Sequence, residues 1–252
     1  GGHAVISIGH SQSDFVSKIK EQLDQIAFYS NAVKNPLQGQ LANAIAEHSC
    51  LYDYQLFLCS TGAEAIENAL KLASFHTQKK RVIAFENAFH GRTSAAVSVT
   101  DNPSINAPLN AQHEVTFLPF NDHILLEKEL KKGDVCAVIF EAIQGVGGLD
   151  QPDEGFIYAM ESLCKKFDAC LIADEVQSGF ARTGTFFAFQ KYRISPHIIT
   201  MAKGMGNGFP IGGILIHPDI KSKYGLLGTT FGGNHLACTA SLSVLKVLKK
   251  ER

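Results

Sequence analysis

Short apolar runs alternate along the chain with segments whose apolar positions follow a helical period. Several of these runs are apolar without alternation, which is typical of strands buried on both faces of a parallel sheet. We therefore predict a strand at each run. The predicted strands are Gln55–Cys59, Arg81–Phe85, Val115–Leu118, Val135–Phe140, Cys170–Ala173 and His197–Met201.

Helical segments lie between these runs. Ile66, Ala69, Leu70 and Ala73 occupy the i, i+3, i+4 and i+7 positions of one helix face. Further helices are predicted over Asn121–Leu130, Gly155–Phe167 and His235–Lys250. This alternation predicts an α/β fold of three layers, α/β/α, with a mostly parallel sheet. Because no repeat or flexible linker divides the chain, we predict one domain over residues 1–252.

The composition narrows the class of protein. The sequence is 45% hydrophobic and 19% charged, as expected of a globular protein. A formal net charge of -1 gives no field to attract nucleic acid or an anionic membrane surface. No apolar run approaches the roughly 20 residues of a membrane span. The six cysteines form no C-x-x-C pair, so we expect reduced thiols in a cytoplasmic protein.

Ligands of such folds bind beyond the carboxyl ends of the strands, and the first unusual segment follows Cys59. Thr61 and Glu64 have the spacing of a capping box. Gly62 and Ala63 lack bulk, so an anion could approach the free N–H groups of the first helical turn. Taken alone, this segment is more often an ordinary helix cap.

Two later strands end in polar residues of a different kind. The run to Ala173 is followed by Asp174 and Gln177. A carboxylate there can keep a heteroaromatic ring nitrogen protonated and so make the ring an electron sink, and Gln177 suits a hydrogen bond to a ring hydroxyl. The run to Met201 is followed by Lys203. A lysine at a dry strand end loses its charge readily and becomes nucleophilic.

Each of these residues also has a commoner explanation. A solvated acid often ends a strand, and a lone lysine beside glycines is usually on the surface. Phe89 and Arg92, after another strand, suit stacking on a planar ring and a bidentate grip on a carboxylate, but also a packed ring and a surface ion pair. Together and in this order, the residues make up the full set that a pyridoxal phosphate site requires.

Other chemistries find less support in the sequence. We expect no metal site, because H-E-x-x-H and zinc-spaced Cys/His clusters are absent, and G-x-S-x-G does not occur either. A dinucleotide oxidoreductase is disfavoured because no G-x-G-x-x-G opens a helix after a strand. A non-catalytic binding protein is disfavoured by the joint presence of Lys203, Asp174 and Gln177.

On these motifs the sequence resembles the class III (ornithine-type) pyridoxal-phosphate-dependent aminotransferases, with closest similarity to the acetylornithine/succinylornithine branch. The resemblance covers essentially the whole chain. It implies the large domain of a fold-type I pyridoxal phosphate enzyme. The segments that carry it are Gly2–Val5, Ser60–Ala65, Phe89–Thr93, Asp174–Gln177, Ala202–Gly204 and Gly228–Asn234.

The resemblance implies pyridoxal 5'-phosphate as cofactor and a role for each matching residue. Lys203 would hold the cofactor as a Schiff base and then carry the proton between the carbon bearing the reacting amine and the cofactor. Asp174 would pair with the ring nitrogen, and Gln177 would contact the phenolic oxygen. The remaining cofactor-binding residues would be Thr61, Gly62 and Ala63 at the phosphate, Phe89 at the ring face, His90 beside it, and Thr230.

Thr230 resembles the threonine that reaches the phosphate of the neighbouring subunit, so a homodimer is implied. Arg92 resembles the arginine that binds the substrate carboxylate. Glu141 lies in what resembles the family's Glu-Pro-x-Gln-Gly segment near the site, which implies a role in substrate binding. The implied reaction moves the terminal amine of N2-acetylornithine, or of N2-succinylornithine, to 2-oxoglutarate in arginine biosynthesis. Another class III ω-aminotransferase or an aminomutase is the alternative.

The sequence departs from the family pattern at three positions. Ala142 replaces a proline after Glu141, Val146 replaces a glutamate that pairs with an active-site arginine in relatives, and Ser13 replaces the proline of an early Gly-His-x-x-Pro pattern. Relatives also carry a segment before the position of Gly1 and a small domain beyond residue 252. The 252-residue chain is therefore expected to hold cofactor weakly and not to turn over.

Overall fold

The computed structural model describes residues 1–221 and 223–251. Within them, seven strands form one sheet in the order β1-β7-β6-β5-β4-β2-β3. Among these strands, β7 alone runs opposite to the others, so the predicted mostly parallel sheet is confirmed. The strands are β1 Gln55–Cys59, β2 Arg81–Phe85, β3 Val115–Leu118, β4 Val135–Phe140, β5 Cys170–Asp174, β6 Ile198–Met201 and β7 Gly212–Ile216.

The helices follow the expected alternation, with additions that the sequence pattern did not reveal. Helices α3, α5, α6 and α7 were predicted, whereas α1, α2 and the short α4 were not. The bounds are α1 Ser13–Gln25, α2 Pro36–Ser49, α3 Gly62–Thr77, α4 Ser94–Ser98, α5 His123–Leu130, α6 Glu154–Lys166 and α7 His235–Lys250. Among the described residues, no helix combines the length and the apolar character needed to cross a membrane.

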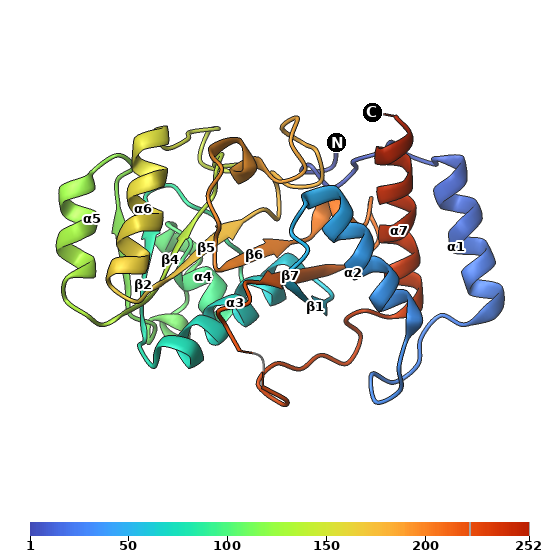
Figure 1. Cartoon of the computed structure of the whole chain (residues 1–252), viewed down its shortest axis with the longest axis horizontal. Coiled ribbons are helices and arrows are strands. Elements are labelled where there is room, and N and C mark those ends of the chain that lie inside the picture. Colours follow the sequence, from blue (N-terminus) through green and yellow to red (C-terminus); the bar gives the residue numbers. More distant parts are fainter. Residues whose placement is uncertain (222, 252) are drawn as a thin grey trace.

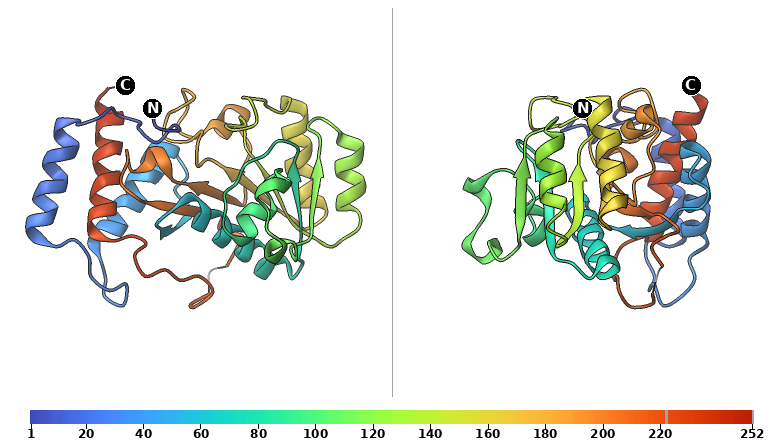
Figure 2. Two further views of the ribbon diagram at one scale, coloured as in Figure 1. Left: turned by 180° about the vertical axis from the view of Figure 1, so that it is seen from behind. Right: turned by 60° about the vertical axis from the view of Figure 1, so that its left-hand side comes forward.

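The helices cover the sheet on both faces, as the three-layer prediction required. Helix α3 packs across one face, against β1, β4, β5, β6 and β7, with α4 beside it. Helix α6 packs against β4 and β5 on the other face. Figures 1 and 2 show α5 and α6 side by side at one end of the molecule, and α1, α2 and α7 grouped at the other end.

Two apolar clusters fill the spaces between the layers. Ile139, Ile172 and Ile198 point toward the alanine-rich face of α3, while the residues next to them in sequence, such as Leu171 and Ile199, belong to the cluster on the opposite face. Because side chains alternate between the faces of a strand, a sheet covered on both sides needs apolar residues at every position. This accounts for the runs without alternation.

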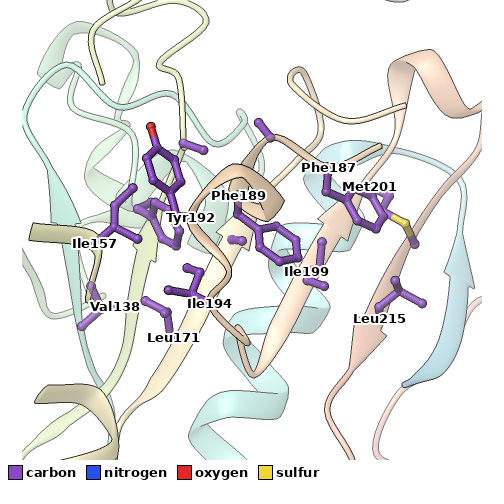
Figure 3. Close-up of a cluster of buried hydrophobic side chains, with 14 of the residues drawn as sticks. Val138, Ile157, Leu171, Phe187, Phe189, Tyr192, Ile194, Ile199, Met201 and Leu215 are labelled. Carbon is purple, nitrogen blue, oxygen red and sulfur yellow. The ribbon is translucent and has the colours of Figure 1, made fainter. Parts of the chain in front are cut away.

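The cluster opposite α3 contains a short 3-10 helix, η3 (Ala188–Tyr192). Figure 3 shows Phe187 and Phe189 lying over Met201 and Ile199 of the sheet. The two rings are stacked, with centroids 5.8 Å apart, and both are fully buried. Phe187, Ala188, Phe189 and Tyr192 are therefore part of the core, whereas Lys191 of the same turn is exposed.

Strand β7 was not predicted, and glycine explains why. Its first two residues are Gly212 and Gly213, which give no apolar signal. A Cβ atom at Gly212 would lie 2.5 Å from the carbonyl oxygen of Thr61. Only glycine lets β7 approach the segment that joins β1 to α3 this closely.

We expect Gly212→Ala to destabilise the protein by about 1–3 kcal/mol, because the atom that the new methyl meets is backbone and cannot rotate away. The free energy of unfolding, measured by circular dichroism in urea, tests this. Gly155→Ala in α6 is the control, since nothing lies within 4 Å of its added Cβ. Equal stability of the two variants would contradict the close approach.

Candidate active site

A cavity of about 310 Å³ opens at one edge of the sheet. The carboxyl ends of the parallel strands β1, β2, β4, β5 and β6 all lead into residues that line it. This is where ligands bind in open α/β sheets, and the volume suits a small organic molecule. The residues that line the cavity just after these strands include Ser60, Thr61, Phe89, His90, Glu141, Asp174 and Lys203.

The structure brings most of the predicted site residues to this one cavity. Two predicted residues lie elsewhere. Arg92 is exposed and follows the lining residue Gly91. Thr230 is also exposed, in the segment before α7, where its carbonyl oxygen accepts a hydrogen bond from Asn31 Nδ2 at 3.4 Å. The predicted residues that line the cavity are Thr61, Gly62, Ala63, Phe89, His90, Glu141, Asp174, Gln177 and Lys203.

Helix α3 begins at the cavity wall and is firmly capped there. Thr61 Oγ1 accepts the Glu64 N–H at 3.1 Å, and the Glu64 carboxylate accepts the Ser60 N–H at 2.7 Å. The N–H groups of Gly62 and Ala63 belong to the first turn, where the helix itself supplies no acceptor. A Cβ at Gly62 would lie 2.8 Å from Val176 Cγ1. This wall is therefore a helix N-terminus with N–H groups available to an anion, and it tolerates little bulk.

Asp174 is the most completely hydrogen-bonded acid of the cavity. It is 5% exposed. Its Oδ2 accepts from His90 Nδ1 at 2.7 Å, and its Oδ1 accepts from Thr200 Oγ1 and from the Val176 N–H, both at 3.0 Å. Because an ionised carboxylate only accepts, His90 must carry its proton on Nδ1. These three donors fix the orientation of the carboxylate.

His90 has an unusual second nitrogen. The residue is 4% exposed, and its Nε2 has no hydrogen-bond partner among the described residues. Burial acts to lower the pKa of His90, but the hydrogen bond to Asp174 and the charges of Asp174 and Glu141 outweigh burial and raise it. The contact with Asp174 therefore favours the protonated form of the His90 imidazole.

Lys203 follows β6 at the start of a 3-10 turn, Lys203–Met205. Its φ of +44° is rare for a residue with a side chain, and such strain is often found at functional positions. Burial lowers the pKa of Lys203, outweighing the charges of Asp174 and Glu141, which act to raise it. A lysine with a lowered pKa has more of its amine in the neutral, nucleophilic form at neutral pH.

Glu141 connects two loops of the cavity. Its carboxylate accepts the Phe89 N–H at 3.1 Å and the Gly145 N–H at 2.9 Å. Burial raises the pKa of Glu141, opposed by the charge of His90. The two N–H groups come from the loops after β2 and β4. Glu141 therefore fixes the position of these loops relative to each other, and it also lines the cavity. A Cβ at Gly145 would collide with the Gln177 side chain, so Gln177 lies directly over this loop.

Sequence reasoning missed the apolar walls of the cavity. Val5, Val176 and the segment 208–211 line it together with the residues above. Val5 comes from the start of the chain, which is tied down by hydrogen bonds from Ser7 Oγ to the Gly204 carbonyl, at 2.8 Å, and from the Ser7 N–H to Asn207 Oδ1, at 2.9 Å. No local pattern marks these residues, because their role depends on contacts across about 200 residues.

The whole chain, residues 1–252, matches the family described as Aminotransferase class-III. It is 41% identical to the acetylornithine aminotransferase of Bacillus anthracis, over 99% of this chain and 64% of that protein. It is 42% identical to the acetylornithine aminotransferase of Archaeoglobus fulgidus, over 99% of this chain and 67% of that protein. The chain thus spans about two thirds of the length of these relatives.

The fold of the chain is also similar to that of a solved structure. The ornithine aminotransferase of Toxoplasma gondii, crystallised with partial occupancy of PLP at its active site, aligns with a TM-score of 0.91. Its sequence identity is 30%, and the alignment covers 99% of this chain and 62% of that one.

The lowered pKa of Lys203 predicts unusual reactivity. In brief acetylation with acetic anhydride over a series of pH values, followed by peptide mass spectrometry, Lys203 should reach half of its maximal rate at lower pH than Lys80. Lys80 is the internal reference, because its hydrogen bond to Glu114 raises its pKa. A midpoint for Lys203 at or above that of Lys80 would show that burial does not control this amine.

Proposed function

The chain belongs to the class-III aminotransferases, and from this premise we propose that it binds pyridoxal 5'-phosphate and transfers the terminal amine of N2-acetylornithine, or of N2-succinylornithine, to 2-oxoglutarate. The products are the corresponding semialdehyde and glutamate, which places the protein in arginine biosynthesis. One observation carries the proposal: Lys203, Asp174 and the N-terminus of α3 line the same cavity. The identity of about 40% to acetylornithine aminotransferases supports the choice of donor.

The residues of the cavity fit pyridoxal phosphate. The first turn of α3 offers N–H groups at Gly62 and Ala63 to a phosphate, and the near-collision of a Cβ at Gly62 with Val176 explains why bulk is excluded there. A buried carboxylate, Asp174, suits a protonated ring nitrogen. The half-buried Phe89 suits contact with a planar ring. The cavity thus supplies an anion site, an acid, an aromatic and an amine.

When bound, pyridoxal phosphate supplies a carbonyl that bonds to amines and a ring that accepts the electron pair released at the carbon bearing the amine. Lys203 contributes a neutral amine, first as the group that bonds the cofactor and then as the base that takes up and returns the proton of that carbon. Burial, which lowers the pKa of Lys203, makes both roles accessible near neutral pH.

Asp174 holds a proton at the ring nitrogen through its negative charge. The three hydrogen bonds from His90, Thr200 and Val176 fix the orientation of this carboxylate. Gln177, which lies over Gly145, would contact the phenolic oxygen of the cofactor. Thr61 contributes by capping α3 and so orienting the N–H groups that bind the phosphate.

Substrate recognition rests on fewer residues of this chain. We assign the donor carboxylate to Arg92, which follows the lining residue Gly91, and a place beside the substrate to Glu141. Val146 lines the cavity where an acid stands in the family pattern. It cannot form an ion pair with an arginine, so an arginine on the substrate side would meet an apolar wall here.

The proposal extends to assembly and location. Thr230 is exposed and lies outside the lining of its own cavity, which agrees with a homodimer in which it reaches the phosphate of the neighbouring subunit. Phe231, next to it, is 61% exposed and contacts Phe28, so an apolar surface accompanies Thr230. The free cysteines of the chain suit a reducing compartment such as the cytoplasm.

The first test concerns the cofactor. The chain is mixed with pyridoxal phosphate, reduced with borohydride and digested, and the modified peptide is identified by mass spectrometry. We expect the adduct on Lys203, because its amine is the lysine amine that lines the cavity. Lys203→Ala should abolish the adduct and the visible absorbance, whereas Lys191→Ala, at an exposed position, should retain both. An adduct spread over surface lysines would refute the assignment.

The second test concerns the donor. Glutamate formed from 2-oxoglutarate is measured with N2-acetylornithine, N2-succinylornithine, ornithine and taurine as donors, using cofactor-loaded protein in which the chain is joined to the flanking segments that its relatives carry. We expect the two acylated donors to react fastest, and Arg92→Ala to raise KM for them by roughly 10- to 100-fold, since a bidentate carboxylate contact is lost. Faster reaction with taurine or with free ornithine would assign the chain to another aminotransferase of the class.

A further inference from the structure

The residue after Asp174 is a second buried acid that does not line the cavity. Glu175 is 1% exposed. Its Oε2 accepts the Ala188 N–H at 2.9 Å and the Ser178 hydroxyl at 2.7 Å, and its Oε1 accepts the Phe189 N–H at 2.9 Å. Asp174, the last residue of β5, lines the cavity, whereas Glu175, directly after the strand, is buried away from it.

Burying this acid is costly, and the structure offsets the cost only with neutral donors. Burial raises the pKa of Glu175 to about 7, while the hydrogen bonds from Ala188, Phe189 and Ser178 act to lower it. Among the described residues, no cation forms an ion pair with it. A core position that served packing alone would favour an apolar side chain, because an unpaired buried charge is expensive. The presence of a carboxylate at this position is therefore best explained by the backbone segments that its hydrogen bonds join.

The bonds connect the cavity to the rigid part of the core. Ala188 and Phe189 belong to η3, which is held in place by the stacked rings of Phe187 and Phe189 (Figure 3). The Glu175 N–H also donates to the Thr200 carbonyl at 3.0 Å, and Thr200 donates its hydroxyl to Asp174. Glu175 thus fastens the end of β5 to both β6 and η3.

The chain between these points forms a loop that contributes two residues to the cavity. The loop leaves at Glu175, carries Val176 and Gln177 along the cavity wall and returns at Ala188. The Gly179 N–H donates to the Glu175 carbonyl at 3.0 Å, and a Cβ at Gly179 would lie 2.7 Å from that oxygen. The side chain of Glu175 closes the base of this loop.

We propose that Glu175 is a positioning residue for the cofactor: by closing the loop 175–189 onto η3, it sets the places of Asp174, Val176 and Gln177 in the cavity. The inference rests on the proposed binding of pyridoxal phosphate. It assigns a role in that binding to Glu175, although Glu175 does not line the cavity. Glu175 acts through its neighbours and does not touch the cofactor.

The test compares Glu175→Gln with the unaltered chain. Glutamine has the same size but replaces one acceptor oxygen with an NH2 group, which would face the N–H of Ala188 or Phe189 as donor against donor. We expect the dissociation constant for pyridoxal phosphate to rise about tenfold, because one of these backbone N–H groups loses its acceptor and the loop is no longer closed onto η3. The pH midpoint of the visible absorbance at Lys203 should also shift, because Asp174 moves relative to the ring nitrogen.

Glu129→Gln is the matched control. Glu129, on α5, is a similarly buried acid, at 7% exposure. It forms ion pairs with Arg81 and Lys132 and does not line the cavity. Its replacement should lower stability but leave the cofactor affinity within about twofold and the absorbance midpoint unchanged, because distant sites act independently. Equal losses of affinity in the two variants would overturn the proposal, since a general loss of stability would then explain both.

Ser178→Ala decides the matter if Glu175→Gln does not fold. It removes one donor to Glu175 and keeps the carboxylate, so affinity should fall about threefold with the same direction of spectral shift. A folded Glu175→Gln or Ser178→Ala protein with unchanged affinity and spectrum would refute the positioning role and leave the proposed function intact. Absence of any Lys203 adduct in the unaltered chain would refute both.

Discussion

Burial of a parallel sheet on both of its faces is the constraint on which the rest of this structure depends. Parallel strands end at a common edge, and helices on both faces leave that edge as the place where polar residues can gather. Here β1, β2, β4, β5 and β6 each deliver a polar or charged residue to one cavity. The antiparallel β7 joins the sheet through Gly212, whose lack of a side chain allows it to approach Thr61. The geometry of the sheet thus brings the residues of the site together at one edge.

Within the cavity, the same burial changes the ionisable groups in different directions. It lowers the pKa of Lys203 and raises that of Glu141, because it disfavours the charged form of each. For His90, the hydrogen bond and charge of Asp174 are stronger than burial, and the pKa rises. Burial thus shifts the Lys203 amine toward its neutral form, whereas Asp174 shifts the His90 imidazole of the same cavity toward its protonated form. Such a separation of acid and base roles among neighbouring groups is typical of catalytic sites.

Buried carboxylates also hold the cavity together mechanically. Glu141 joins the loops after β2 and β4 through the N–H groups of Phe89 and Gly145, and Glu175 joins the end of β5 to η3. Glu141 accepts N–H groups from residues 52 and 4 positions away, and Glu175 from residues 13 and 14 positions away, so each acid ties two separate backbone segments together. Loops fixed in this way can hold Gln177 and Phe89 in defined positions. A binding site for a planar cofactor requires such fixed positions.

The sequence by itself determined the strands from β1 to β6, the helix that follows β1, and the positions of Asp174 and Lys203 at strand ends, where both line the cavity. These are local properties, since an apolar run and the polar residue after it are adjacent in the chain. It did not reveal β7, where glycine removes the apolar signal, or α1 and α2. Only the tertiary structure placed Arg92 outside the cavity lining, added Val5 to it and joined Glu175 to η3. Those outcomes depend on contacts between residues far apart in the chain, which form only when the backbone closes on itself and which local periodicity does not record.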